Sequence, residues 1–160
     1  MSIIKEKFIS AYMDVAERFA QLSSAKRLQV GAIVVKDERI ISIGYNGTPS
    51  GWDNNCEEIV SSKNINDFQN DTTYDKTTKL YSRLTSKPEV LHAEMNALMK
   101  LAKSSESGNN ATMFVTHAPC INCAKGIYQA GIKEVYYKTK YRDDSGIKFL
   151  LKGGVVVSKQ

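Results

Sequence analysis

The chain has 160 residues, a length typical of one compact domain, and 42% of its residues are hydrophobic while 24% are charged. This composition excludes collagen-like, disordered and coiled-coil proteins. No apolar run approaches the roughly 20 residues that span a bilayer, and charges interrupt the first ten residues, so we expect neither a membrane protein nor a secretory signal. The net charge of +5 favours anionic partners without choosing between nucleic acid and nucleotides, and it also fits a solvated surface with no such partner.

The beginning of the chain predicts a helix followed by a pair of strands. Apolar residues recur at steps of three or four from Ile4 to Phe19, which indicates an amphipathic helix, with Ser2 as its N-cap. Residues 30–35 (VGAIVV) are apolar and rich in β-branched side chains, as in a buried strand. Residues 40–45 predict a second strand, and the polar turn between the two strands predicts a hairpin.

The next part of the chain differs in composition from the rest. Residues 46–51 (NGTPSG) are turn formers, and residues from about 53 to 89 are crowded with Asn, Asp, Ser and Thr, without a sustained apolar period. A structureless loop of this length is uncommon in a compact domain. We therefore expect residues 1–160 to form a single domain that carries a functional polar insertion at about 53–89, with some local order.

Helices and strands alternate after the insertion. The pattern predicts helices at 93–103, 119–130 and 146–152, and strands at 112–116, 135–138 and 155–158. Together with the earlier strand pair, this order predicts an α/β fold, a three-layer α/β/α sandwich around a mixed five-stranded sheet.

The metal-binding side chains are few: Cys56, Cys120, Cys123, His92 and His117. Three cysteines are too few, and an odd number, for a typical secreted disulfide framework. The pattern suits a reducing compartment, with two of the cysteines in a C-x-x-C pair used for metal or redox chemistry.

Cys120 and Cys123 follow Pro119 at the start of a predicted helix, where a spacing of three places both on one face. The free N–H groups and the helix dipole at a first turn favour thiolates. With the imidazole of His92, the two thiolates make three ligands for tetrahedral zinc, which leaves the fourth position for water, as in a catalytic site. Glu94 follows His92 by two residues and can exchange a proton with that water.

Each part of this pattern is weak alone. A lone C-x-x-C also occurs in redox pairs and structural zinc sites, and H-x-E is frequent by chance. His117 could replace His92 as a ligand, but we expect it to have a supporting role at the end of a strand. The order H-A-E, strand, P-C-x-x-C is far more specific, and it is a known signature of zinc nucleobase deaminases.

On these motifs the sequence resembles the deoxycytidylate (dCMP) deaminases of the cytidine deaminase superfamily, in particular their compact bacterial and bacteriophage forms. The 45 residues between Asn46 and His92 also resemble this branch. Free-cytidine deaminases often have Cys where His92 stands, and tRNA adenosine deaminases usually have a shorter gap. The matching segments are Gln29–Gly51 (QVGAIVVKDERIISIGYNGTPSG), His92–Leu98 (HAEMNAL), Thr112–Tyr137 (TMFVTHAPCINCAKGIYQAGIKEVYY) and Tyr141–Gly146 (YRDDSG).

The resemblance implies a cytidine deaminase-like fold and one catalytic zinc ion held by His92, Cys120 and Cys123. It implies that Glu94 moves protons during the hydrolytic deamination of dCMP to dUMP, which supplies thymidylate synthesis. Whether dCTP is also a substrate stays open, because spacing does not reveal how many phosphates the pocket admits.

The resemblance also implies residues that contact the substrate. These are Asn46 at the deoxyribose, Arg27 as a candidate for the 5′-phosphate, Tyr141 near the nucleotide, and Ala93. From the residues alone, three of them have plainer interpretations: Asn46 as a turn residue, Arg27 as a solvated surface residue and Tyr141 as a half-buried edge aromatic.

Family members are often activated by dCTP, inhibited by dTTP and assembled as hexamers. We therefore expect a regulated homo-oligomer, a hexamer, with an effector site near Asn46, Gly47 and Gly51, whose backbone N–H groups suit a triphosphate accompanied by Mg²⁺. Some members bind a second, structural zinc ion. Here Cys56 has neither a spare cysteine nor a histidine in the insertion to join it, so we expect a half-buried residue or a free thiol.

Two other functions stay open, namely a deaminase of tRNA or single-stranded DNA and a non-catalytic, zinc-stabilised scaffold. The segment Asp53–Glu89 has seven acidic and five basic residues, so it supplies no basic stripe for a polynucleotide. A scaffold would not need Glu94. We therefore expect a nucleotide enzyme in the cytoplasm of a bacterium or of a phage-infected host, with no nucleic-acid or membrane partner.

Overall fold

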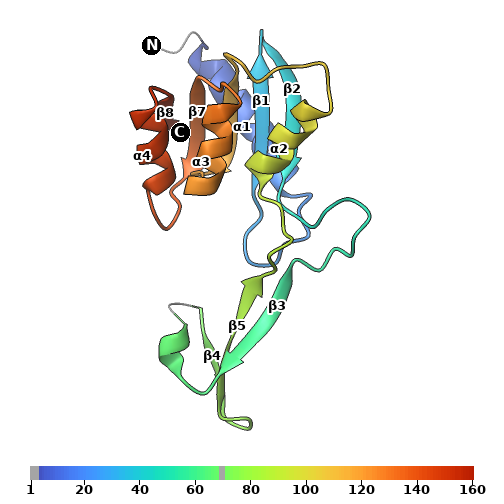
Figure 1. The fold of residues 1–160 in the computed structure, drawn as a ribbon, viewed down its shortest axis with the longest axis vertical. Coiled ribbons are helices and arrows are strands. Elements are labelled where there is room, and N and C mark those ends of the chain that lie inside the picture. Colours follow the sequence, from blue (N-terminus) through green and yellow to red (C-terminus); the bar gives the residue numbers. More distant parts are fainter. Residues whose placement is uncertain (1–3, 69–70) are drawn as a thin grey trace.

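The computed structural model describes residues 4–68 and 71–160 (Figure 1). In this part of the chain, five strands form a sheet in the order β2-β1-β6-β7-β8. β1 is antiparallel to β2 and to β6, whereas β6, β7 and β8 are parallel, so the predicted mixed sheet is confirmed. The strands are β1 (Gly31–Lys36), β2 (Arg39–Tyr45), β6 (Thr112–His117), β7 (Glu134–Thr139) and β8 (Val156–Lys159).

Helices cover both faces of this sheet, which confirms the three-layer arrangement (Figure 1). Alternate residues of β1 face the two helical layers. Ile33 and Val35 belong to the core cluster that includes α1, whereas Ala32 and Val34 belong to the cluster that includes residues of α2, α3 and α4. The helices are α1 (Glu6–Ala20), α2 (Ala93–Ala102), α3 (Ile121–Gln129) and α4 (Ser145–Lys152). None of the helices in the described residues is both long and apolar enough to cross a membrane.

The ends of these elements lie within a few residues of their predicted positions. Asp37 and Glu38 form the turn between β1 and β2 with φ values of 48° and 60°, as a tight two-residue hairpin requires. The N-cap prediction is wrong, because α1 begins at Glu6 and Lys5 stands at its N-cap. Ser2 itself lies outside the described residues.

Much of the polar insertion folds into a second, three-stranded antiparallel sheet with the order β3-β5-β4. We call residues 57–86 the arm; it extends away from the five-stranded sheet (Figure 1). Its elements are β3 (Glu57–Ser62), the short 3-10 helix η1 (Ile65–Asp67), β4 (Thr73–Asp75) and β5 (Leu80–Ser86). Most side chains of β3 and all of β4 are exposed, so neither face imposes the apolar alternation by which a strand is predicted.

Candidate active site and metal centre

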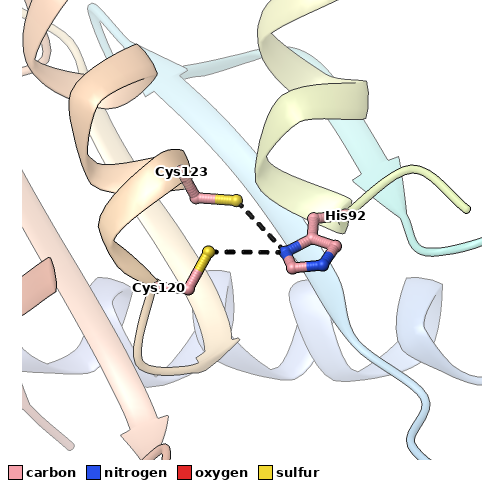
Figure 2. Close-up of side chains that lie close together, drawn as sticks. All are labelled: His92, Cys120 and Cys123. Atoms are coloured by element: carbon pink, nitrogen blue, oxygen red, sulfur yellow. Dashed lines mark hydrogen bonds between the residues drawn. The ribbon is translucent and has the colours of Figure 1, made fainter. Parts of the chain in front are cut away.

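The side chains of His92, Cys120 and Cys123 converge at the beginnings of two helices (Figure 2). His92 is the N-cap of α2, Cys120 is the N-cap of α3, and Cys123 lies in the first turn of α3. The His92 Nδ1 atom lies 3.6 Å from the Sγ of Cys120 and 3.4 Å from the Sγ of Cys123. The three ligand atoms all lie within 4.8 Å of one another. The structure thus brings together the three residues predicted to hold zinc.

Two glycines let neighbouring backbone approach these helix beginnings. A Cβ atom on Gly44, in β2, would lie 2.2 Å from the carbonyl oxygen of Ala93 in α2. A Cβ atom on Gly146, in α4, would lie 2.0 Å from the carbonyl oxygen of Pro119, directly before Cys120. Both distances are far below van der Waals contact, so only glycine fits. Sequence reasoning missed both residues; the signal was a glycine inside a strand and one at the start of a helix.

The two cysteines change each other's pKa in opposite directions. The pKa of Cys120 is lowered to about 3, first because the thiol of Cys123 donates to its thiolate and next because the His92 ring does. The pKa of Cys123 is raised, first because Cys120 accepts its proton in that hydrogen bond and next because of burial. The pKa of His92 is raised, chiefly by its hydrogen bond with Cys120. A divalent cation would displace the proton of Cys123 and take both sulfurs as thiolates.

This donor set fits zinc, which binds thiolate sulfur and imidazole nitrogen. Cys123 is buried, Cys120 is half-buried and His92 is exposed, so the cluster is closed on the side of α3 and open on the side of His92. Three protein ligands with one open side correspond to a catalytic zinc site, whereas structural sites have four protein ligands.

Glu94 lies in the first turn of α2, beside the cluster, and is buried with 4% of its surface exposed. Burial raises the pKa of this carboxyl to about 7, and the nearby His92 ring opposes the rise. A carboxyl in this environment can hold or release a proton near neutral pH, as a general acid and base must. Ala93, between His92 and Glu94, is fully buried at the first position of α2.

Asn46 holds the segment that leads into β1. Its Oδ1 accepts the N–H of Val30 at 2.8 Å, and its Nδ2 donates to the carbonyl of Leu28 at 2.8 Å. The next residue, Gly47, pairs with Leu91 through two backbone hydrogen bonds of 3.1 and 2.8 Å. Because Leu91 directly precedes His92, the loop with Asn46 is joined to the cluster.

Arg27 is exposed, and its Nη1 donates to the Oγ of Ser86 at 3.4 Å. Tyr141 is half-buried and packs against the core cluster to which α2 and α3 contribute. Arg142, which sequence reasoning missed, places its guanidinium 5.2 Å from the Tyr141 ring. The charge of Arg142 lowers the pKa of His92, against the larger rise caused by Cys120. The adjacent Tyr141 was the signal that could have indicated Arg142.

The remaining His and Cys residues lie outside the cluster. His117 is the last residue of β6, and its Nδ1 is 3.0 Å from the Oγ1 of Thr116, a position at the end of a strand as expected. Cys56 is a free thiol, as one of the two expectations had it, but it is buried rather than half-buried, and its Sγ lies 3.3 Å from the Oγ of Ser24. Gly51, at the end of the 46–51 loop, is exposed with a left-handed φ of 87°.

Comparison with known proteins agrees with this site. The family model described as "cytidine and deoxycytidylate deaminase zinc-binding region" matches residues 6–139. The chain is 34% identical over 154 residues to the deoxycytidylate deaminase of Enterobacteria phage T4, covering 82% of this chain and 78% of that one. It is 38% identical to the human deoxycytidylate deaminase over 134 residues, which are 82% of this chain and 65% of the human protein.

A solved structure extends the likeness to nearly the whole chain. The dCMP deaminase of cyanophage S-TIM5, crystallised in complex with dCMP and dUMP, is 44% identical, with a TM-score of 0.80 over 98% of this chain and 99% of that one. A tRNA adenosine deaminase shares the fold with a TM-score of 0.56 at 21% identity. Since the family model spans most of the sequence and includes the residues of the cluster, the chain belongs to the family of zinc-binding cytidine and deoxycytidylate deaminases.

Proposed function

We propose that this chain catalyses the hydrolytic deamination of dCMP to dUMP with one zinc ion. The observation that carries the proposal is the convergence of His92, Cys120 and Cys123 beside the buried carboxyl of Glu94. Its substrate follows from the likeness, over nearly the full length, to a dCMP deaminase crystallised with dCMP and dUMP. The product would supply thymidylate synthesis in the cytoplasm.

His92, Cys120 and Cys123 would hold the zinc ion. Zinc bound there would supply Lewis-acid activation of a water molecule. Glu94 would take one proton from the attacking water and deliver it to N3 of the cytosine ring, where it remains in the uracil product. Glu94 would then carry the second proton, from the new hydroxyl at C4, to the amine that leaves as ammonia. The burial of Glu94 supports this role, because bulk water cannot compete for the proton.

The rest of the nucleotide would be held by Asn46 at the deoxyribose, Arg27 at the 5′-phosphate, Tyr141 beside the nucleotide, and Ala93 near the base. The link from Gly47 to Leu91 supports the role of Asn46, because it fixes that loop next to His92. Each side-chain amide atom of Asn46 has one hydrogen bond to backbone, so each keeps the capacity for one more. The exposure of Arg27 supports its role, because its positive charge is accessible on the segment that Asn46 holds.

We further propose a homo-oligomer, a hexamer, that dCTP activates and dTTP inhibits. The effector site would include Asn46, Gly47 and Gly51, with Mg²⁺ bound by the triphosphate. The placement of this loop supports the proposal, because it adjoins both the insertion and the residue before His92. An effector there could move Asn46 and so change the affinity for the substrate.

The proposed function is tested by offering the zinc-loaded protein five substrates: dCMP, dCTP, deoxycytidine, cytidine and a single-stranded oligonucleotide that contains cytosine. We expect a high kcat/KM for dCMP and a low one for deoxycytidine and cytidine, because the phosphate supplies much of the binding energy. Equal values for dCMP and deoxycytidine, or deamination of the oligonucleotide alone, would contradict the proposal.

A further inference from the structure

A buried carboxylate outside the catalytic cluster stands at the root of the arm. Glu57, the first residue of β3, has only 4% of its surface exposed. Its Oε1 accepts two backbone N–H groups, from Lys26 at 2.8 Å and from Arg27 at 3.2 Å. Its Oε2 is buried and has no hydrogen-bond partner among the described residues.

This arrangement is costly to stability, because a buried carboxylate oxygen without a partner loses its hydration without compensation. The next residue, Glu58, is exposed on the same strand, so an acid in β3 need not be buried. The two bonds at Oε1 are charge-assisted and therefore stronger than those of a neutral acceptor. The cost of burying Glu57 has an explanation if its hydrogen bonds fix the segment with Lys26 and Arg27 in a position that function requires.

The side chain of Arg27 also forms a hydrogen bond with this end of the arm. Ser86, the partner of Glu57 in the β3–β5 register, accepts a hydrogen bond from the Nη1 of Arg27 at 3.4 Å. The backbone N–H of Arg27 is thus bound by Glu57, and its guanidinium is bound by Ser86, the residue paired with Glu57 at the beginning of the arm.

The other end of the segment is held by Asn46, through Leu28 and Val30. Since Gly47 is bonded to Leu91, next to His92, Asn46 ties the segment to the metal cluster. Glu57 and Asn46 therefore hold the backbone on the two sides of Arg27.

We propose that Glu57 is a positioning residue that sets the place of the Arg27 guanidinium for the 5′-phosphate of the nucleotide. The inference rests on the proposed function, in which Arg27 is the phosphate contact. It makes the root of the arm part of the selection of nucleotides over nucleosides, because a charged anchor aids binding only when it is held in the right place.

The experiment measures kcat/KM for dCMP and for deoxycytidine and takes their ratio. Glu57→Ala lowers the ratio about fivefold to tenfold, by a rise in KM for dCMP at nearly constant kcat. In an Arg27→Ala background, adding Glu57→Ala changes the ratio by less than about twofold, since the residue acts through Arg27. Glu57→Gln, which keeps an oxygen acceptor, recovers most of the ratio, and Glu58→Ala is the matched control on the same strand.

If Glu57→Ala does not fold, Ser86→Ala takes its place, because Ser86 is exposed and its loss removes only the partner of the guanidinium. The expected effect on the ratio is then about twofold to threefold, again absent in the Arg27→Ala background.

The outcomes separate this inference from the proposed function. A wild-type protein that does not deaminate dCMP would refute the proposed function. Wild-type activity on dCMP with an unchanged ratio in folded Glu57→Ala, or in Ser86→Ala where that variant replaces it, would refute the role of Glu57 alone. An unchanged ratio in Arg27→Ala would refute the proposed phosphate contact of Arg27 and with it the role of Glu57, while the deamination of dCMP would stand. An equal loss for dCMP and deoxycytidine would also refute it, because damage to the fold does not depend on the phosphate.

Discussion

The Nδ1 atom of His92 lies 3.4 Å from the Sγ of Cys123, across the space between the first turns of α2 and α3. The contact fixes which ring nitrogen faces the sulfurs, so Nδ1 is the atom available to a metal and Nε2 points elsewhere (Figure 2). Since both helices begin at this contact, the geometry of the site depends on the position of their N-termini as well as on the ligands themselves.

Zinc content is the first property that follows. The purified protein holds one zinc ion per chain, and Cys120→Ser reduces this content severalfold, because it removes one of three ligands. Inductively coupled plasma mass spectrometry of dialysed protein measures the ratio. Cys56→Ser is the control, since Cys56 lies outside the cluster and its loss leaves the zinc content unchanged. Full activity in metal-free protein would contradict this account.

The packing of α4 against the beginning of α3 gives a second prediction. Gly146→Ala places a Cβ where the carbonyl of Pro119 stands, so α4 and the beginning of α3 must separate. We expect the free energy of unfolding to fall by about 1–3 kcal/mol, together with the zinc content. Denaturant titration measures the stability. Gly47→Ala is the stability control, because a Cβ there meets no atom within 4 Å. A Gly146→Ala protein as stable as the wild type would show that this contact has no such role.

Regulation is tested by steady-state kinetics on the wild-type protein. With dCTP and Mg²⁺ present, the curve of rate against dCMP concentration shifts to lower concentration, and with dTTP it shifts to higher concentration. The physical reason is that two effectors that prefer different states bias one equilibrium in opposite directions. A hyperbolic curve that neither nucleotide moves, at concentrations well above the micromolar range, would refute regulation and leave the catalytic proposal intact.

Much of the sheet was predictable because buried strands require runs of apolar residues, which can be recognised in the sequence. The apolar run of β1 arises because both of its faces are covered, by α1 on one side and by α2 on the other. The cluster was predictable for a different reason. Zinc restricts the residue types and their spacing so strongly that H-A-E and P-C-x-x-C can be identified without knowledge of the fold.

Other features left no such pattern. In the arm, most side chains of β3 and all of those of β4 are exposed and those of β5 are mostly half-buried, so no apolar period marked these strands. Glu57 owes its place to backbone N–H groups about 30 residues earlier, and a carboxylate in a polar segment looks like any solvated acid. The roles of Gly44 and Gly146 depend on which backbone passes next to them, which follows from tertiary packing alone.

The rate of dCMP deamination by the Glu94→Gln protein tests the central claim most directly. The substitution is nearly isosteric and removes only the group that moves protons, so we predict one zinc ion per chain, an unchanged fold and a kcat at least about 10²-fold lower than that of the wild type. Release of dUMP from dCMP, followed by chromatography, measures the rate. A Glu94→Gln protein that retains most of the wild-type rate would contradict the account.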